Sequence, residues 1–198
     1  TSAAKFSGYD MSTPGEQTVE VSYTEGEKTV KTTYQLTVLA ADSDVTDKLN
    51  LAFTGQSGTT YGPWSGKKAS SDAVYAGNTA GDKSSIQLRS NNSNSGIVTT
   101  TSGGYAKKVV VTWHSETSND RTLNIYGKNT AYTAATDLYD TAKQGTLLGT
   151  IKKGTSTEFV IPGNYQYIGL RSASGAMYIT EIQITWSSSP IALESIAV

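Results

Sequence analysis

Strict alternation of apolar and polar residues on both sides of a glycine turn is the strongest constraint on how this chain folds. The run Thr18–Tyr23 is followed by the turn Glu25-Gly26-Glu27 and then by a longer alternating run that ends at Val38. Successive side chains of a β-strand point to opposite faces, so each run has one apolar and one polar face. Two such runs separated by a short turn predict an antiparallel hairpin with one solvated face. The apolar face comprises Val19, Val21, Tyr23, Val30, Tyr34, Leu36 and Val38.

The rest of the chain has the composition of an all-β protein. The 198 residues include 29 Thr, 24 Ser, 19 Gly and 12 Tyr but only 2 Met, and β-branched and aromatic residues favour strands. Nine short runs separated by Gly, Asn and Ser predict a β-sandwich or jelly roll, and one helical turn is expected at Asp137–Thr141. The predicted strands lie near Leu49–Phe53, Ser84–Ser90, Gly96–Thr101, Lys108–Trp113, Thr122–Tyr126, Thr146–Ile151, Thr157–Ile161, Tyr165–Arg171 and Tyr178–Trp186.

A change in composition and periodicity separates the hairpin from this larger region. Residues Ala40–Lys48 are small or acidic and show no periodicity, which is typical of a linker. After the break at Ser187–Ser189, the eight residues Ile191–Val198 form a short apolar run that is too small to be a domain. We therefore expect a first unit over 1–40, a linker over 41–47, a sandwich over 48–187, and a lone strand over 188–198. Since the chain starts at Thr1 rather than Met, we expect either that it is processed or, in preference, that it is part of a longer protein.

Several motifs resemble known bacterial modules. The stretch Tyr9-Asp10 with Ser12–Gly15, the run TVEVSYTEG and the closing YQLTV resemble the C-terminal half of a bacterial immunoglobulin-like repeat, and the tail LESIAV resembles the first strand of another repeat. Between them, GPW, VYAGN, SIQLRS, GIVTT, RTLNIYGKN, DLY, LGTI and YIGLRSASGAMYITEIQITW resemble, in order, a β-sandwich accessory module of large secreted or surface proteins of gut bacteria. The resemblance implies a secreted or cell-surface location beside immunoglobulin-like spacers.

Charge and composition exclude several functional classes. The 16 Lys and Arg nearly balance the 17 Asp and Glu, so the basic surface of a nucleic-acid binder is absent. No apolar run approaches 18 residues, which argues against membrane insertion. The absence of Cys and the single His exclude thiol chemistry and multi-His metal sites. We expect no cofactor, although a structural calcium ion at Asp42-x-Asp44-x-x-Asp47 is an alternative to a polar linker there.

The candidates for catalysis are weak. His114 follows a strand, and no G-x-S-x-G elbow accompanies it, so exposure at a strand end explains it more simply. A glycosidase needs two carboxylates across a sugar, but most acids here occur in turns, and Glu158 and Glu181 alternate with apolar residues in strands. We therefore expect a protein that is not an enzyme, with a hydrolase as the third hypothesis.

The candidates for ligand binding are aromatic and arginine side chains. Trp64 stands in a Gly-Pro-Trp-Ser-Gly segment that we interpret as a loop, with Tyr61 and Tyr75 near it. A loop aromatic either stacks on a sugar ring or closes the end of the sandwich. Arg89 and Arg171 each end an apolar strand, where a guanidinium either binds a sugar hydroxyl or carboxylate or holds loop carbonyls. In contrast, alternation assigns Trp113 and Trp186 to the core.

These observations favour a non-catalytic extracellular module that binds a glycan or another surface ligand. The alternative is a structural spacer or adhesin stalk with no ligand of its own. The two ends suggest a further contact: the run over 190–198 lacks a sheet, and the hairpin over 18–38 has an unpaired edge. We expect the C-terminal strand to add to a sheet edge of the same or a neighbouring molecule, which would cause self-association.

Overall fold

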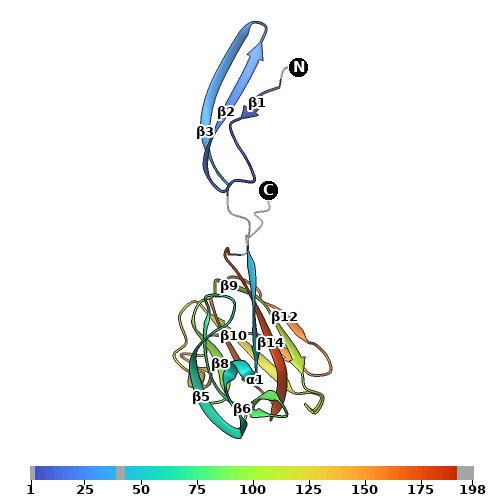
Figure 1. The fold of residues 1–198 in the computed structure, drawn as a ribbon. Helices are drawn as coiled ribbons and strands as arrows, with labels where there is room; N and C mark the ends of the chain where they lie inside the picture. The colour runs from blue at the N-terminus through green and yellow to red at the C-terminus, as the bar shows by residue number, and fades with distance from the viewer. Residues whose placement is uncertain (1–2, 39–42, 191–198) are drawn as a thin grey trace. The chain divides into compact units, whose positions relative to one another are not determined.

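A computed structural model describes residues 3–38 and 43–190 (Figure 1). The chain divides into two compact units, Thr1–Asp42 and Ser43–Val198. The predicted C-terminal strand over 191–198 lies outside the described residues, as do linker residues 39–42.

The first unit is a three-stranded antiparallel sheet that contains the predicted hairpin. Its strands are β1 (Lys5–Ser7), β2 (Gly15–Glu25) and β3 (Lys28–Val38), in the order β1-β2-β3. Val19 pairs with Tyr34, and Glu25 pairs with Lys28 around a turn in which Gly26 has φ +58°. Val19 and Val38 are buried, whereas Val30 and Tyr34 of the same face are exposed. The hairpin is thus confirmed, and within this unit its apolar face is only partly covered.

The second unit is almost entirely antiparallel β-structure, which confirms the all-β fold class. One four-residue helix and one 3₁₀ turn, η1, interrupt the strands; η1 matches the helical turn predicted near Asp137. The elements are β4 (Asp44–Asn50), α1 (Leu51–Thr54), β5 (Gly58–Lys68), β6 (Val74–Asp82), β7 (Ser85–Leu88), β8 (Gly96–Thr101), β9 (Tyr105–Trp113), β10 (Thr122–Lys128), η1 (Ala135–Tyr139), β11 (Thr146–Lys152), β12 (Glu158–Val160), β13 (Tyr167–Ser172) and β14 (Met177–Ser187).

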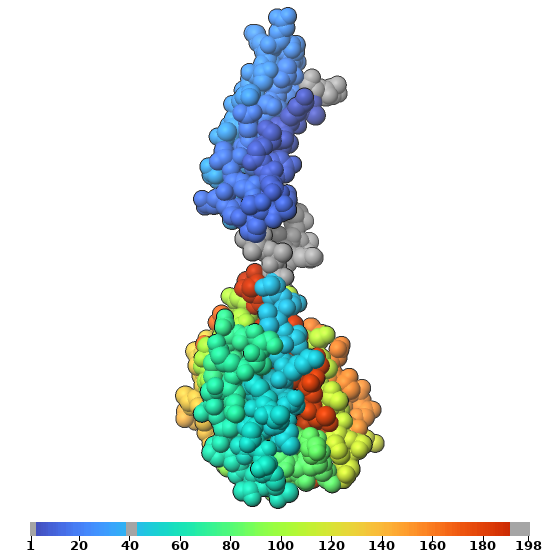
Figure 2. Space-filling view, viewed as in Figure 1, coloured from blue at the N-terminus to red at the C-terminus, as the bar shows by residue number. Residues whose placement is uncertain are grey.

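The strands form a sandwich of two layers joined through β7. The β6 layer has the order β5-β6-β8-β13-β10-β11, and the β14 layer has the order β4-β14-β9-β12. Strand β7 pairs with the end of β6 and with the start of β14, so the hydrogen bonding is continuous between the layers. Figure 2 shows β4 (cyan) beside β14 (red) on the surface of this unit.

The main core fills the space between the layers. It includes Ile97, Ile125 and Leu170 of the β6 layer and Val109 and Ile182 of the β14 layer. Trp186 is fully buried there, as predicted, whereas Trp113 is only partly buried and packs against this core. Each of these strands buries one face in the core, which explains the alternation of apolar and other residues in its sequence.

A second, smaller core covers part of the opposite face of the β6 layer, which we call the outer face. The segment 129–145, which contains η1, places Tyr132 and Leu138 over Ala76, Val98 and Tyr126. Leu138 lies directly over Gly96 and Gly169, where a Cβ atom would come within 2.7 Å and 2.3 Å of it, respectively. Glycine at these two positions lets the segment lie close to the sheet.

Three parts of the second unit differ from the sequence-based predictions. Asp44–Asp47, expected in the linker, begins strand β4, and the strand expected near Leu49–Phe53 ends at Asn50. The amide of Asn50 then accepts a hydrogen bond from the Phe53 N–H at 3.0 Å, which caps helix α1. Strands β5 and β6 were not predicted, and Trp64 lies in β5 rather than in a loop.

Candidate functional site

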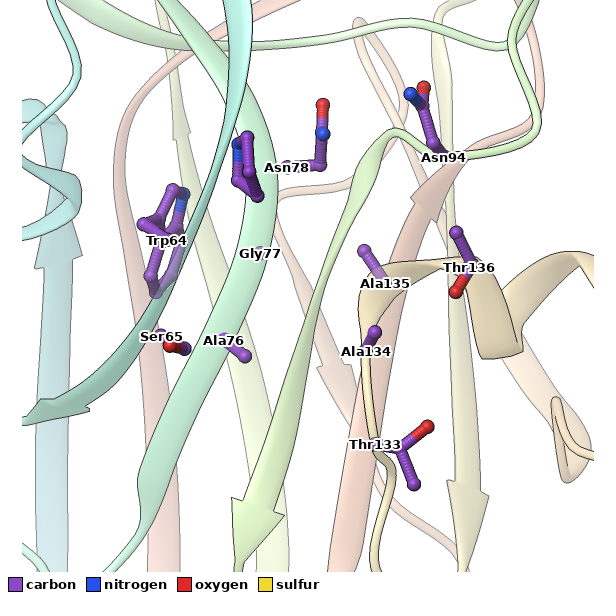
Figure 3. Close-up of a pocket in the computed structure, with 11 residues that line it drawn as sticks. Trp64, Ser65, Ala76, Gly77, Asn78, Asn94, Thr133, Ala134, Ala135 and Thr136 are labelled. Atoms are coloured by element: carbon purple, nitrogen blue, oxygen red, sulfur yellow. The ribbon is translucent and has the colours of Figure 1, made fainter.

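A cleft of about 400 Å³ opens on the outer face between strands β5 and β6 and the residues at the start of η1 (Figure 3). Its floor is the outer side of β6, and Figure 3 shows Ala134 and Ala135 on the opposite side of Ala76 and Gly77 from Trp64 and Ser65. The lining is mostly apolar or small, with two amides. It consists of Pro63, Trp64, Ser65, Ala76, Gly77, Asn78, Asn94, Thr133, Ala134, Ala135 and Thr136.

The register of β5 against β6 determines which side chains reach this face. Pro63 pairs with Asn78 and Trp64 with Gly77. Since side chains at paired positions share a face, Pro63 and Asn78 lie on the outer face and Trp64 turns toward the main core. The Trp64 ring packs on Gly77, where an added Cβ would be 2.5 Å from the ring. A side chain at position 77 would therefore displace this ring.

Burial limits what Trp64 offers to a ligand. It is 8% exposed, and its indole N–H donates to the Thr79 hydroxyl at 3.0 Å. Its ring meets Phe53 edge to face at 6.0 Å between centroids. These contacts fit the alternative in which Trp64 closes one side of the sandwich, and they leave only its edge beside the cleft.

Unpaired polar atoms gather on the outer face. Among the described residues, five buried side-chain atoms have no hydrogen-bond partner: Tyr61 OH, Asn78 Oδ1, Gln87 Oε1, Arg89 Nε and Asn94 Oδ1. Asn78 and Asn94 line the cleft. Ala80 of β6 pairs with Gln87 of β7, which places Gln87 in line with Asn78 and Arg89 on the same face. Sequence reasoning identified Tyr61 and Arg89 but missed the three amides, because isolated amides in β-sequences carry no distinctive spacing.

Tyr61 and Arg89 form a stacked pair beside the cleft. The guanidinium carbon of Arg89 lies 3.7 Å from the centroid of the Tyr61 ring, which is cation–π contact. With the Asn92 amide oxygen facing it, Arg89 Nη2 donates to that oxygen at 2.8 Å. Burial raises the pKa of Tyr61, and the positive charge of Arg89 opposes this effect. The two predicted residues are thus brought together, and the Tyr61 hydroxyl is neutral over the physiological pH range.

Arg171 occupies a comparable position on β13. Its Nη1 donates to the carbonyl of Leu138 at 2.6 Å, and its guanidinium carbon lies 4.6 Å from the Tyr139 ring centroid and 5.3 Å from that of Tyr126. The Tyr139 hydroxyl donates to the Ser95 carbonyl at 2.8 Å. Arg171 therefore holds η1 against the sheet, which is the loop-holding role considered from the sequence, and it also lies on the outer face.

Tyr75 does not reach the cleft. It is completely buried, and its hydroxyl donates to Asp47 Oδ2 at 2.6 Å. Burial raises its pKa strongly, and the negative charge of Asp47 adds to this. The side chain therefore stabilises the core beneath the candidate site and contacts no surface ligand in this conformation.

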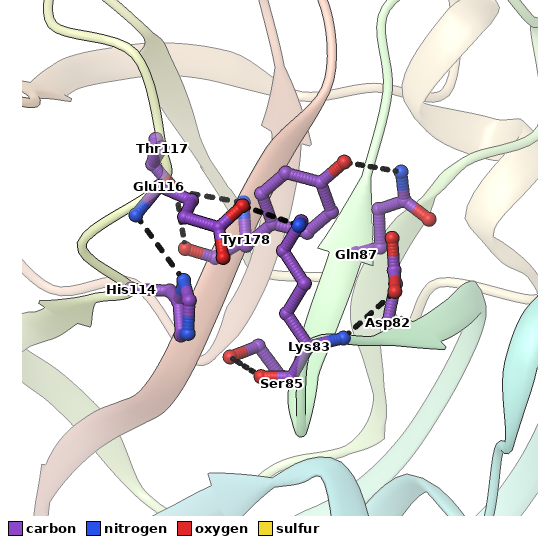
Figure 4. Close-up of polar contacts among 8 residues, drawn as sticks. All are labelled: Asp82, Lys83, Ser85, Gln87, His114, Glu116, Thr117 and Tyr178. Atoms are coloured by element: carbon purple, nitrogen blue, oxygen red, sulfur yellow. Dashed lines mark hydrogen bonds and ion pairs between the residues drawn. The ribbon is translucent and has the colours of Figure 1, made fainter.

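His114 belongs to a different cluster at the edge of the unit (Figure 4). Its Nδ1 accepts a hydrogen bond from the backbone N–H of Glu116 at 3.2 Å, and its ring lies 6.4 Å from the Tyr178 ring. Lys83 forms an ion pair with Glu116 and lies over the Tyr178 ring. Within the described part of the chain, the contacts of His114 therefore hold a turn and include no serine hydroxyl.

The acidic residues considered for calcium are used in other ways. Asp47 accepts hydrogen bonds from the backbone N–H groups of Ser70 and Ser71 at 2.8 and 2.7 Å, and Asp44 forms an ion pair with Lys107 at 3.0 Å. Asp42 lies outside the described residues. Among residues 3–38 and 43–190, no group of three or more His, Cys, Asp or Glu side chains is arranged to hold a metal ion. No helix in the same part of the chain is long and apolar enough to cross a membrane.

Comparison with known proteins gives a limited result. The chain matches no protein-family model, and it matches no curated protein. Among solved structures, it is similar to the CBM51-2 and INT domains of Clostridium perfringens ZmpB, with 13% sequence identity and a TM-score of 0.31. The similarity covers 93% of this chain and 40% of that one. A likeness at this level places no constraint on function.

Proposed function

We propose that the second unit binds a glycan without catalysing a reaction, through the outer face of the β6 layer. The cluster of five unpaired polar atoms on this one face carries the proposal. A buried polar group without a partner costs about 1–3 kcal/mol, so a group of them has no benefit for the stability of the sandwich alone. Each of the five residues is only half-buried, so part of each reaches the surface of this face.

The chemistry of this face suits a sugar. Pyranose rings offer hydroxyl groups that donate and accept hydrogen bonds, together with an apolar ring face. Asn78 and Asn94 supply both donors and acceptors, while Ala76, Ala135 and Pro63 supply an apolar surface in the cleft. A cleft with mostly apolar walls and a few polar groups is the usual form of a small-molecule site.

The proposal that the unit is not an enzyme rests on how its carboxylates are used. Asp82 Oδ1 accepts the backbone N–H of Lys83 at 2.8 Å, and Asp137 Oδ2 accepts the N–H and hydroxyl of Thr133 at 2.7 and 2.9 Å. Both groups thus stabilise local turns near the outer face. We further propose a secreted or cell-surface location, where an accessory module of this kind would meet glycans and contribute to adhesion.

A glycan array with the full-length chain tests the proposed function. We expect binding to at least one glycan, and the double variant Asn78→Ala/Asn94→Ala should weaken it by about tenfold or more, since two polar contacts are lost. Asn119→Ala, at an exposed position in another loop, is the matched control. Absence of binding to every glycan would favour the spacer alternative. Release of reducing sugar from a bound polysaccharide would overturn the non-catalytic part of the proposal.

A further inference from the structure

The outer face carries two guanidinium groups that form no ion pair with a carboxylate of the described residues. In the described part of the chain, the ion pairs are formed by lysines, and neither Arg89 nor Arg171 has an acidic partner. A guanidinium has five N–H donors. Arg171 uses one of these for the Leu138 carbonyl, and the Nε of Arg89 is buried without an acceptor. Both side chains therefore retain positive charge and hydrogen-bonding capacity.

The strand register places Arg89 and Arg171 in one row that crosses the outer face. Strand β13 pairs with β8 at Leu170 and Ile97, and β8 pairs with β6 at Gly96 and Asn78. Arg171, one residue after Leu170, therefore lies opposite Gly96, in the same row as Asn78. Neighbouring strands in this row are about 4.8 Å apart. The backbone N–H of Arg89 donates to the hydroxyl of Ser95 at 3.2 Å, and Ser95 directly precedes Gly96. The charges of both arginines act on the pKa of Tyr139, which lies beside them.

A tyrosine ring lies against each of the two guanidinium groups. Arg89 lies over Tyr61 at 3.7 Å and Arg171 over Tyr139 at 4.6 Å. Stacking occupies the faces of a guanidinium and leaves its edges, which carry the N–H groups, free to bind a planar anion. An arginine held in this way loses less conformational entropy when it forms a bidentate contact.

We propose that the glycan bound by this face is acidic, and that Arg89 and Arg171 bind its anionic group. This inference rests on the proposed glycan-binding function. The group is a carboxylate, as in a uronic acid, or a sulfate ester; both present the oxygen atoms that a guanidinium binds. The amides of Asn78 and Asn94 would then contact the hydroxyls of the same or the next sugar ring.

Paired probes that differ only in charge test the inference with the full-length chain. Oligogalacturonate is compared with its methyl ester, and a sulfated galactan oligosaccharide with its desulfated form. We expect one acidic member to bind about tenfold or more tightly than its neutral partner, and the pair that shows this difference identifies the anion. The affinity of the wild-type chain for that member should fall with added salt, because screening weakens the contact.

Two variants assign the residues. Arg89→Gln and Arg171→Gln should each weaken binding of the acidic probe by about tenfold and so reduce its preference over the neutral partner. Lys108→Gln, which removes one positive charge from the β14 layer, is the matched control. The thermal midpoint of each variant shows whether it folds. The salt dependence of the wild-type chain tests, without a substitution, whether the bound group is anionic.

The outcomes separate this inference from the proposed function. Equal binding of acidic and neutral partners, or preference for the neutral ones, would overturn the acidic ligand and leave glycan binding intact. Salt-dependent acidic binding that both glutamine variants retain would overturn the assignment to Arg89 and Arg171. Failure of every glycan on the array to bind would overturn the proposed function, and this inference with it.

Discussion

The carboxylate of Asp47 accepts a hydrogen bond from the indole N–H of Trp186 at 3.0 Å, at a point where four segments of the second unit meet. The same oxygen accepts the hydroxyl of Tyr75 at 2.6 Å, and the other oxygen accepts the backbone N–H groups of Ser70 and Ser71. Asp47 thus joins β4, β6, β14 and the turn between β5 and β6. Its charge is buried but fully hydrogen-bonded, which is the condition under which proteins tolerate such a group.

We predict that Asp47→Ala destabilises the second unit by about 3 kcal/mol or more. The substitution removes the acceptor of the Ser70 and Ser71 backbone N–H groups and of the Tyr75 hydroxyl, while the Trp186 indole keeps only the Tyr75 hydroxyl at 3.1 Å. Each buried donor left without an acceptor costs about 1–3 kcal/mol. Urea unfolding followed by tryptophan fluorescence measures the change. Asp44→Ala, on the same strand, removes only the partly exposed ion pair with Lys107 and should cost less than about 1 kcal/mol. Equal losses at the two positions would contradict the role given to Asp47.

The three tryptophans should differ in their contribution to stability. Trp186 and Trp64 belong to the main core, whereas Trp113 is partly buried at its edge and donates a long hydrogen bond of 3.4 Å to Ser156. We expect Trp186→Ala and Trp64→Ala each to cost about 3–5 kcal/mol through the cavity that remains, and Trp113→Ala to cost less. Calorimetry of the three variants gives the order.

The result for Trp64 also discriminates between its two interpretations. A loss of several kcal/mol should lower the thermal midpoint by about 10 °C in a chain of this size. An unchanged midpoint together with weaker glycan binding would instead show that Trp64 serves the ligand. Loss of the same free energy at all three positions would contradict the burial order in the structure.

Alternation made most of the sandwich predictable. Strands β8, β9, β10 and β14 bury side chains of large β-branched or aliphatic residues on the main core, and their predicted positions agree with the structure within a few residues. Strand β6 was missed because small residues pack on both of its faces, so no period of two is visible. Strand β5 was missed because Gly62, Pro63 and Gly66 are typical of loops; an edge strand tolerates them.

The candidate site was less predictable than the fold because it is built on strands β5 and β6, whose sequences lack clear alternation. Its floor is the outer side of β6, and its other wall is the start of η1, far from β6 in the sequence. The charged and aromatic residues at strand ends could be identified, and Tyr61 and Arg89 do lie together. The roles of Asn78, Gln87 and Asn94 depend on the pairing of β5, β6 and β7, which the sequence pattern does not specify.

Acid should loosen the segment that carries η1. Burial of Asp137 acts to raise its pKa, but hydrogen bonds from Thr133 and Ala134 and the charge of Lys128 outweigh this, so its pKa is lowered. A carboxyl with a lower pKa in the folded state stabilises the fold above its unfolded pKa of about 4, and this stabilisation is lost as the pH falls through the folded value.

The variant Asp137→Asn measures this contribution. Near pH 6 it should be less stable than the wild type, and the difference should shrink as the pH falls below about 4, where the wild-type carboxyl becomes protonated. Denaturant titrations over this range give both free energies of unfolding. The exposed Asp72, which is paired with Lys68 at the surface, provides the control Asp72→Asn, for which we expect little change. A constant difference between Asp137→Asn and the wild type at all pH values would exclude an effect of charge.

The turn between β6 and β7 is strained, and a single substitution should relieve it. Lys83 and Ser84 both adopt the left-handed conformation, with φ of 54° and 55°, as a two-residue type I′ hairpin turn requires. Such conformations cost non-glycine residues about 1 kcal/mol or more, and glycine adopts them without a steric penalty. Ser84→Gly should therefore raise the stability of the second unit by about 1 kcal/mol, or its thermal midpoint by about 2–4 °C.

Ser93→Gly, in a loop where the serine has a negative φ, controls for the added flexibility and should give no gain. A lower midpoint for Ser84→Gly than for the wild type would show that the flexibility of the unfolded chain outweighs the strain at this turn.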